Sequence, residues 1–213
     1  MDDQLSSIFK EAHTCHLCPS IPKDDDYPKF GIHNPVPYFK ENFDKNKLKV
    51  VFVLQSAGTA EGGAARTGIL SSKNNYDQSA LNAKELFKAS EISDEVCLFI
   101  NAILHVAIDS SGKMRSPKTS EVRNCNKYLK RIIDELNPPI VAPVGSIALN
   151  ALNLIGELPY KKIKECAGQK FNWYHRIAFP LVLWSPLGLA NRRWNLQLSD
   201  LKKLKQLLDN IIV

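Results

Sequence analysis

The run LKVVFVL at residues 48–54, followed at once by QSAG at residues 55–58, decides the fold. The run is rich in β-branched apolar residues and has the length of a strand that is buried on both faces. The polar, glycine-bearing residues after it are typical of a loop at the end of a strand. Because a strand buried on both faces needs helices above and below it, this stretch predicts an α/β protein.

Three further runs repeat the pattern of the first, at residues 96–104, 140–144 and 177–184. Amphipathic helical stretches lie between them, over residues 79–90, 119–136 and 146–155. A last helix is predicted to begin near Ser199 as its N-cap, with apolar residues at helical spacing. Alternating strands and helices predict a three-layer α/β/α fold around a central, mostly parallel four-stranded sheet.

The size and composition of the chain favour one domain. With 213 residues and 44% hydrophobic residues, the chain can bury one substantial core. Residues 19–47 are rich in Pro, Asp, Lys and Asn and show little periodicity, so we expect an irregular surface excursion there. The sequence therefore predicts a single domain over residues 1–213.

The net charge and the search for targeting signals limit the classes of partner that we expect. The net charge of +6 favours an anionic partner such as nucleic acid, because Lys and Arg that neutralise phosphates release counterions. No apolar stretch is long enough to span a membrane, and the N-terminal residues lack the apolar core of a signal peptide. We expect a soluble, cytoplasmic monomer that binds DNA and no membrane.

The cysteines point to metal or thiol chemistry. Five cysteines in a chain without secretory features disfavour a disulfide framework. The C-x-x-C pair Cys15 and Cys18 brings two thiolates within reach of one metal, and Cys125 with either His105 or Cys97 can complete four ligands. From the residues alone, structural zinc and an iron–sulfur cluster both remain open.

In sheets of this kind, ligands bind beyond the carboxyl ends of the strands. This rule brings residues 55–61, 101–105 and 185–193 to one rim of the predicted sheet. Function is therefore expected at that rim.

Several segments resemble, in order, those of one protein family. RSPKTSEVRNC at residues 115–125 resembles an R-x-P-x-x-E-E-x-x-x-C segment, and INAILH at residues 100–105 resembles I-T-N-V-V-K-C. VGSIA at residues 144–148 resembles the V-x-L-G-x-x-A turn, and CHLC at residues 15–18 resembles a first pair of cluster ligands. Together with LQSAG at residues 54–58, which stands for G-E-A-P-G, they resemble the family 4 and family 5 uracil-DNA glycosylases.

The resemblance implies a 4Fe-4S cluster held by Cys15, Cys18, Cys125 and His105, which stands where the family has its third cysteine. Structural zinc is the alternative.

The resemblance also implies a monofunctional DNA glycosylase, which flips a nucleotide and hydrolyses its N-glycosidic bond. Asn101 would read the edge of the flipped base, as the matching family residue does. Gln55 stands where the family has Glu and has no useful pKa, so it would orient the water, with Glu61 or Asp77 as the nearby acid. Ser185 stands where the family has the His of its H-P-S motif. The expected base pocket consists of Ser56, Ala57, Gly58, Gly68 and Asp77.

These departures widen the range of substrates. The family's base-stacking aromatic falls near Gly68 or Ile69. Without that ring and the His, a damaged, deaminated or hypermodified base, including the modified cytosines of phage DNA, is an alternative to uracil, and the role would then be anti-phage defence. A catalytically silent DNA-binding module of the same fold is the second alternative.

Residues 187–194 combine apolar and basic side chains, and such a loop can wedge an apolar side chain into the duplex while its arginines grip phosphates. A second basic stretch lies just before the helix predicted over 119–136. The expected DNA-binding residues are Arg115, Lys118, Leu189, Asn191, Arg192 and Arg193.

Overall fold

The structure is a computed structural model that describes residues 3–39, 43–70 and 78–211. A five-stranded sheet lies at its centre, in the order β4-β2-β5-β7-β6. The first four strands run parallel to their neighbours, and β6 pairs antiparallel with β7 at one edge. The strands are β2 (Val50–Leu54), β4 (Cys97–Asn101), β5 (Ile140–Pro143), β6 (Phe171–Trp173) and β7 (Arg176–Ala178).

The predicted α/β class with a mostly parallel sheet is confirmed, but the predicted number of strands is wrong. The edge strand β6 was missed because it is short and because Tyr174 and His175 form its turn to β7, both with positive φ, at 44° and 59°. Turns of this kind usually carry Asn or Gly, so the sequence gives no turn signal there.

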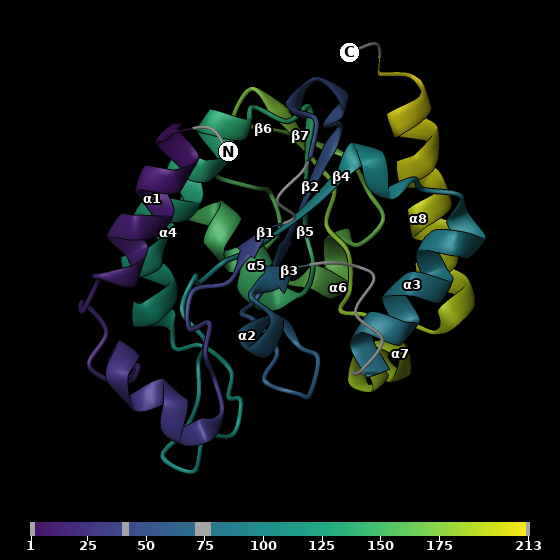
Figure 1. Cartoon of the computed structure of the whole chain (residues 1–213). Coiled ribbons are helices and arrows are strands. Elements are labelled where there is room, and N and C mark those ends of the chain that lie inside the picture. The colour runs from purple at the N-terminus through teal and green to yellow at the C-terminus, as the bar shows by residue number, and fades with distance from the viewer. Residues whose placement is uncertain (1–2, 40–42, 71–77, 212–213) are drawn as a thin grey trace.

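Helices cover both faces of the sheet (Figure 1). On one face lie α1 (Asp3–His13), α4 (Thr119–Leu136) and α5 (Ser146–Asn153), whose apolar side chains share one core with Val51 and Val53 of β2. On the other face lie α3 (Gln78–Ser90) and α8 (Trp194–Asp209), which share a second core with Val50 and Phe52. The alternation of these β2 side chains between two cores explains why the whole run at 48–54 is apolar.

The strand predicted over residues 177–184 ends early, at Ala178. Pairing with β5 continues through hydrogen bonds from Phe179 N to Val141 O (3.0 Å) and from Leu181 N to Pro143 O (2.8 Å). Pro180 interrupts the strand because it has no N–H to donate.

The last helix, α8, begins at Trp194 rather than near Ser199. Gln197 and Asp200 lie in its first turns and are buried although they are polar. Because these two polar side chains interrupt the apolar spacing, the sequence pattern does not indicate that the helix begins at Trp194.

Residues 19–47 are irregular, as expected, but a few of their side chains, including Tyr27, Ile32 and Val36, are buried. Tyr27 is completely buried, and its hydroxyl donates to Val106 O (2.7 Å), while Val106 N donates to Pro35 O (2.9 Å). The segment therefore packs against the residues that follow β4. The segment contains η1 (Asp24–Phe30), β1 (Tyr38–Phe39) and η2 (Lys45–Lys47). Strand β1 pairs with β3 (Ile69–Leu70), and the two form a small parallel sheet.

Short helices complete the fold. They are α2 (Ala64–Thr67), η3 (Asp94–Val96), α6 (Ile163–Cys166) and α7 (Pro186–Asn191). Across residues 3–39, 43–70 and 78–211, no helix has both the length and the apolar character that a membrane span requires.

Candidate functional site

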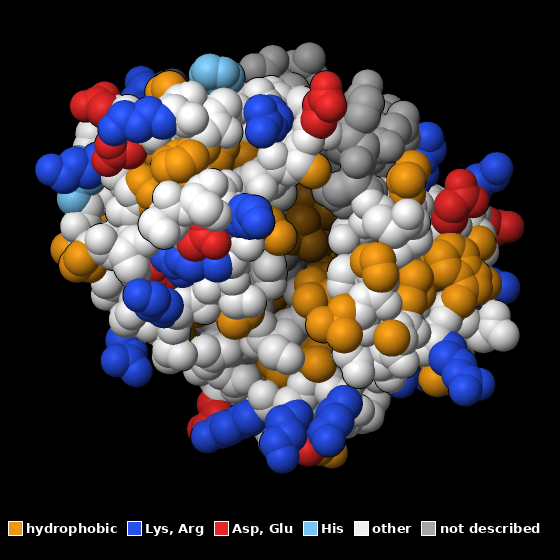
Figure 2. Space-filling model, turned by 90° about the horizontal axis from the view of Figure 1, so that it is seen from below, with side chains coloured by type: hydrophobic (Ala, Val, Ile, Leu, Met, Phe, Trp, Pro, Cys, Tyr) orange, Lys and Arg blue, Asp and Glu red, His pale blue; other side chains and the backbone are white. Residues whose placement is uncertain are grey.

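The carboxyl ends of the parallel strands meet at one rim. Leu54 at the end of β2 is in register with Asn101 at the end of β4. Beyond them, Ile103 N donates to Gln55 O (3.1 Å), and Gly145 N, just after β5, donates to Leu181 O (2.8 Å). Figure 2 shows the face below this rim, where α2 and α7 lie, with a central hollow that has apolar side chains in its depth.

Asn101 and Ser56 are buried at this rim, and their side chains have no hydrogen-bond partner among the described residues. Asn101 is 1% exposed, and neither its Oδ1 nor its Nδ2 makes a hydrogen bond within the described part of the chain. The same holds for the hydroxyl of Ser56, which is 8% exposed. Because buried polar atoms are nearly always paired, an amide and a hydroxyl that have no partner among the described residues make this rim a candidate site for a polar ligand.

The loop after β2 folds tightly back onto itself. Ala65 N donates to Gly58 O (3.1 Å), and a Cβ at Gly63 would lie 2.5 Å from the same oxygen, so only glycine fits there. Gln55 is half-buried, Ala57 is buried and Glu61 is exposed at the tip of the loop. The loop thus begins half-buried at Gln55 and reaches solvent at Glu61.

Gly68, in the predicted base pocket, packs against the segment 31–38. Its φ is +80°, and a Cβ there would lie 2.8 Å from Asn34 Oδ1. Arg66 donates to Gly31 O and to Thr59 O, both at 3.0 Å, which ties this segment to the loop after β2. Asp77, the remaining predicted pocket residue, lies outside the described residues.

Ser185 is the N-cap of α7, and its Oγ accepts a hydrogen bond from Gly188 N (3.1 Å). A Cβ at Gly188 would collide with Leu183 O, so the helix sits directly on the chain that precedes it. In the first turn of α7, Leu187 is 71% exposed, whereas Leu189 is half-buried. Of these two leucines, Leu187 is the one that faces solvent.

The two arginines after α7 differ in their surroundings. Arg192 Nε and Nη2 donate to the two carboxylate oxygens of Asp200, at 2.5 and 2.7 Å, and the Asp200 side chain is 1% exposed. Arg193 is exposed. Asn191 is also exposed, and its Nδ2 donates to Leu187 O (2.9 Å). The structure thus brings Arg192 into an ion pair that ties α7 to α8.

Arg115 and Lys118 lie just before α4. Lys118 is exposed, and its backbone N donates to Glu121 Oε2 (2.7 Å). Arg115 forms two hydrogen bonds with the Glu121 carboxylate, at 2.5 and 2.8 Å. Burial alone would raise the pKa of Glu121, but the hydrogen bonds from Arg115, Ser20 and Lys118 N outweigh it, so the pKa lies below its usual value.

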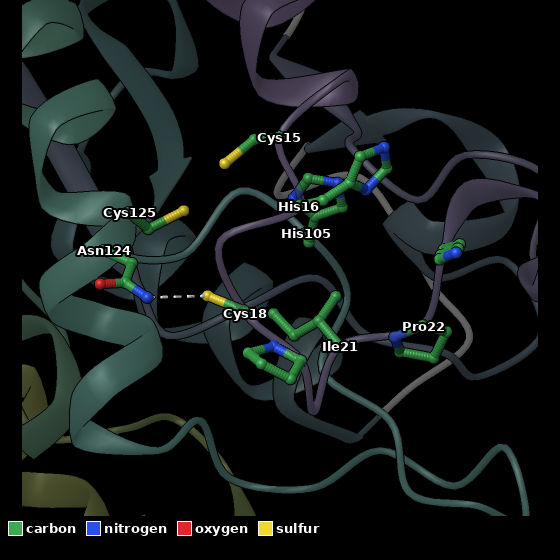
Figure 3. A pocket seen from close by; sticks show the side chains of 10 residues that line it. Cys15, His16, Cys18, Ile21, Pro22, His105, Asn124 and Cys125 are labelled. Atoms are coloured by element: carbon green, nitrogen blue, oxygen red, sulfur yellow. Dashed lines mark hydrogen bonds between the residues drawn. The ribbon is translucent and has the colours of Figure 1, made fainter.

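The predicted metal ligands lie together on another side of the molecule. Cys15, Cys18, His105 and Cys125 all line one cavity of about 110 Å³. Figure 3 shows the sulfurs of Cys15, Cys18 and Cys125 facing a common space, with His105 at its side. In the described parts of the chain, no three Cys, His, Asp or Glu side chains lie close enough to bind one ion between them.

The cavity holds its thiols in an apolar but hydrogen-bonding environment. Burial raises the pKa of Cys125 to about 12 and also raises the pKa of Cys18. Leu104 N donates to Cys125 Sγ (3.3 Å), and Asn124 Nδ2 to Cys18 Sγ (3.5 Å). Amide donors of this kind tune the sulfurs that hold a metal group.

The other two cysteines are absent from the lining of this cavity. Cys97 lies at the start of β4, the end opposite to His105, and its thiol donates to Ser93 O (3.2 Å). Cys166 is buried at the end of α6, and burial raises its pKa to about 11. Of the two predicted alternatives for the fourth ligand, the structure brings His105 to the cavity.

Some residues of these regions had no sequence signal. Asn82 of α3 is buried and donates to Trp184 O (2.7 Å), just before Ser185. Ser20 donates to Glu121 Oε1 (2.6 Å), and Asp200 holds Arg192. Their roles depend on long-range contacts, which no local pattern reveals.

The fold and the rim define a class of protein. It is an α/β protein whose candidate site lies beyond the carboxyl ends of its parallel strands, where Asn101 and Ser56 are buried with no hydrogen-bond partner among the described residues. The chain matches the family described as the Uracil DNA glycosylase superfamily over residues 42–209, and it belongs to that superfamily. Members of the superfamily are generally DNA glycosylases. A search among proteins of curated function found no match.

Proposed function

We propose that this protein is a monofunctional DNA glycosylase, which flips a nucleotide into the hollow at the rim and hydrolyses its N-glycosidic bond. The observation that carries the proposal is Asn101, a buried amide whose donor and acceptor have no partner in the described residues. An amide presents both functions side by side, which suits the donor and acceptor edge of a base.

The reaction builds positive charge on the sugar and negative charge on the leaving base. Asn101 Nδ2 would donate to the base oxygen where that negative charge develops, and Oδ1 would accept from a base N–H. The Ser56 hydroxyl, which is also buried and has no partner among the described residues, would be the second group to contact the base. Because both groups are buried, water competes little with these hydrogen bonds.

Three further residues divide the remaining tasks. Gln55 would orient the attacking water and Glu61 would take its proton, since an amide cannot act as a base. Ser185 accepts from Gly188 N, and its hydroxyl would donate a hydrogen bond to the leaving base while keeping its proton. Asp77 remains a prediction for electrostatic support of the sugar.

Leu187 is the side chain that we assign to the duplex wedge, in preference to Leu189. Its 71% exposure at the start of α7 lets it enter the base stack without any rearrangement of the core. Arg193, Asn191 and Lys118, all exposed, would contact phosphates. Arg115 and Arg192 act mainly through their carboxylate partners in this account.

The thiol-lined cavity would hold a 4Fe-4S cluster through Cys15, Cys18, His105 and Cys125. The donor set fits, since thiolates and an imidazole are ligands of such clusters. Structural zinc is the alternative, because thiolates and an imidazole are also its usual ligands. When bound, the cluster would supply a structural link between the segment after α1 and α4.

A hypermodified cytosine is the second candidate substrate. Gly68 has no side chain where the family has its stacking ring, and Ser185 is smaller than the family's His. Loss of the family's ring and His would allow the site to accept a base that carries an additional group. Excision of such a base from phage DNA would make the protein an anti-phage enzyme.

The test is incubation of the purified protein with uracil-containing duplexes and with phage DNA that carries modified cytosines, followed by alkaline cleavage. We expect alkali-labile breaks in one of these DNAs, and no breaks with the Asn101→Ala variant. Breaks that persist in Asn101→Ala would remove Asn101 from the mechanism. DNA binding without breaks in any DNA would support a catalytically silent module instead.

A further inference from the structure

Two Arg–Glu pairs connect the N-terminal segment, which carries Cys15 and Cys18, to α4, which carries Cys125. One is Arg115–Glu121, which reaches the segment through Ser20, and the other is Glu11–Arg131. The two pairs have the same chemistry and join the same parts of the chain. They differ in burial, which allows their roles to be separated.

The Glu121 carboxylate is the centre of the first connection. It accepts hydrogen bonds from Arg115 Nη1 (2.8 Å) and Nη2 (2.5 Å), from Ser20 Oγ (2.6 Å) and from Lys118 N (2.7 Å). Arg115 Nη2 also donates to Ser20 O (2.8 Å). Ser20 thus donates to Glu121 through its hydroxyl and accepts from Arg115 through its carbonyl.

This network lies one helical turn from the cavity. Ser20 follows Cys18 by two residues, and Glu121 precedes Cys125 by four residues on the same helix. The Glu121 side chain is 1% exposed and that of Arg115 is 20% exposed, so water competes little with their hydrogen bonds. Asn124 adds a contact from α4 to the same loop, since its Nδ2 donates to Leu17 O (3.0 Å).

The second pair lies in solvent. Glu11 and Arg131 are 48% and 45% exposed, and their hydrogen bonds of 2.6 and 2.8 Å join the surfaces of α1 and α4. Exposed pairs contribute little to stability because water screens them and their side chains lose freedom. The buried pair is therefore the one that fixes the loop.

We propose that Glu121 and Arg115 are positioning residues for the metal centre, holding Ser20 against the first turn of α4 so that Cys15 and Cys18 face Cys125. The role of these residues rests on the proposed metal centre. Their arrangement, in which Glu121 and Arg115 hold Ser20 and which we call the clamp, involves the protein chain alone. Neither residue is a ligand. Side chains that orient ligands in this way affect metal affinity strongly, because they reduce the freedom that the ligands lose on binding.

Four full-length proteins test the proposal as purified: the wild type, Glu121→Gln, Ser20→Ala and the matched control Glu11→Gln. Loss of metal to excess EDTA is followed by absorbance, and alkylation of each cysteine by N-ethylmaleimide is followed by mass spectrometry. Cys97 and Cys166, which are buried away from the cavity, report on opening of the whole fold.

We expect Glu121→Gln to bind metal about 10- to 100-fold more weakly than the wild type, the usual loss when groups behind metal ligands are removed, and so to lose it faster to EDTA. Ser20→Ala should change in the same direction by less, and Glu11→Gln should match the wild type. Alkylation of Cys15 and Cys18 should accelerate in the first two variants, while Cys97 and Cys166 stay protected.

The clamp would be overturned if both Glu121→Gln and Ser20→Ala lost metal at the wild-type rate and if Cys15 and Cys18 were alkylated in both variants at the wild-type rate. Equal acceleration at Cys97 and Cys166 in both variants would also overturn it, since the pair would then act on the whole fold. A wild type without metal would refute the proposed metal centre, and the alkylation rates would still decide the clamp.

Discussion

The rim of the sheet and the corner where α4 begins both bury polar side chains, but they treat them in opposite ways. At the rim, the amide of Asn101 and the hydroxyl of Ser56 have no partner within the described chain. At the corner, the carboxylate of Glu121 accepts from three residues at once. Buried polar groups that have protein partners stabilise the fold, and we call these groups the frame. Buried polar groups without such partners are available to a ligand.

The same contrast recurs within a single dipeptide after α7. Arg192 is bound by the buried carboxylate of Asp200, and Arg193 is exposed beside it. Of two identical side chains, one is held in an ion pair inside the protein and the other is exposed, where the proposed function would use it for DNA. Composition and spacing cannot separate them, and the contact with Asp200 does.

The largest effect is expected at the rim, for Asn101→Ala. Loss of a donor to a developing negative charge should lower the single-turnover excision rate about 10²- to 10³-fold. The melting temperature should stay near that of the wild type, because Asn101 has no hydrogen bond in the described protein to lose. A large drop in melting temperature would place Asn101 in the frame instead.

At the frame, Asp200→Ala should act on stability. Removing one member of a buried pair costs about 3 kcal/mol, which corresponds to roughly 6–12 °C in melting temperature for a chain of this size. Arg192 would be left without its partner, and α7 would lose its attachment to α8. A thermal melt that matches the wild type would contradict the assignment of Arg192 to the frame.

A smaller effect is expected at the tip of α7. Leu187→Ala should slow excision from duplex DNA about tenfold, roughly 1.4 kcal/mol, and leave excision from single strands unchanged, since only a duplex needs the wedge. Leu189→Ala, at a half-buried position, is the matched control. Equal losses on both kinds of DNA would refute the wedge.

The smallest effect concerns the two arginines. Arg193→Gln should reduce the slope of log affinity against log salt by about 0.9, the loss of one phosphate contact. Arg192→Gln should leave the slope unchanged and lower the melting temperature. The reverse pattern, read from binding titrations at several salt concentrations, would exchange their roles.

Local signals were enough to predict the helix over 119–136, whose bounds the structure reproduces, and the buried strands β2, β4 and β5. They failed where tertiary contacts dominate. The turn at Tyr174 and His175 adopts positive φ without Asn or Gly, and Gln197 and Asp200 occupy core positions of α8. Gln197 donates to Arg192 O and Asp200 accepts from the Arg192 guanidinium, and the apolar periodicity of the helix reveals neither contact.

The candidate site also contains features that the sequence predicted and features that only the structure revealed. Cys15, Cys18, His105 and Cys125 were predicted as one ligand set, and the structure places them around one cavity. Strand order and the rule for α/β sheets predicted the rim, where Gln55 and Asn101 lie. The clamp at Glu121 and the exposure of Leu187 needed the structure, because both depend on how distant segments pack.

The measurement that tests the central claim most directly is mass spectrometry of the bases released when the wild-type protein is incubated with uracil-containing DNA and with phage DNA bearing modified cytosines. The account predicts a free base, uracil or a modified cytosine, and an equal amount of abasic sites. Release of no base from either DNA, by protein that binds both, would contradict it.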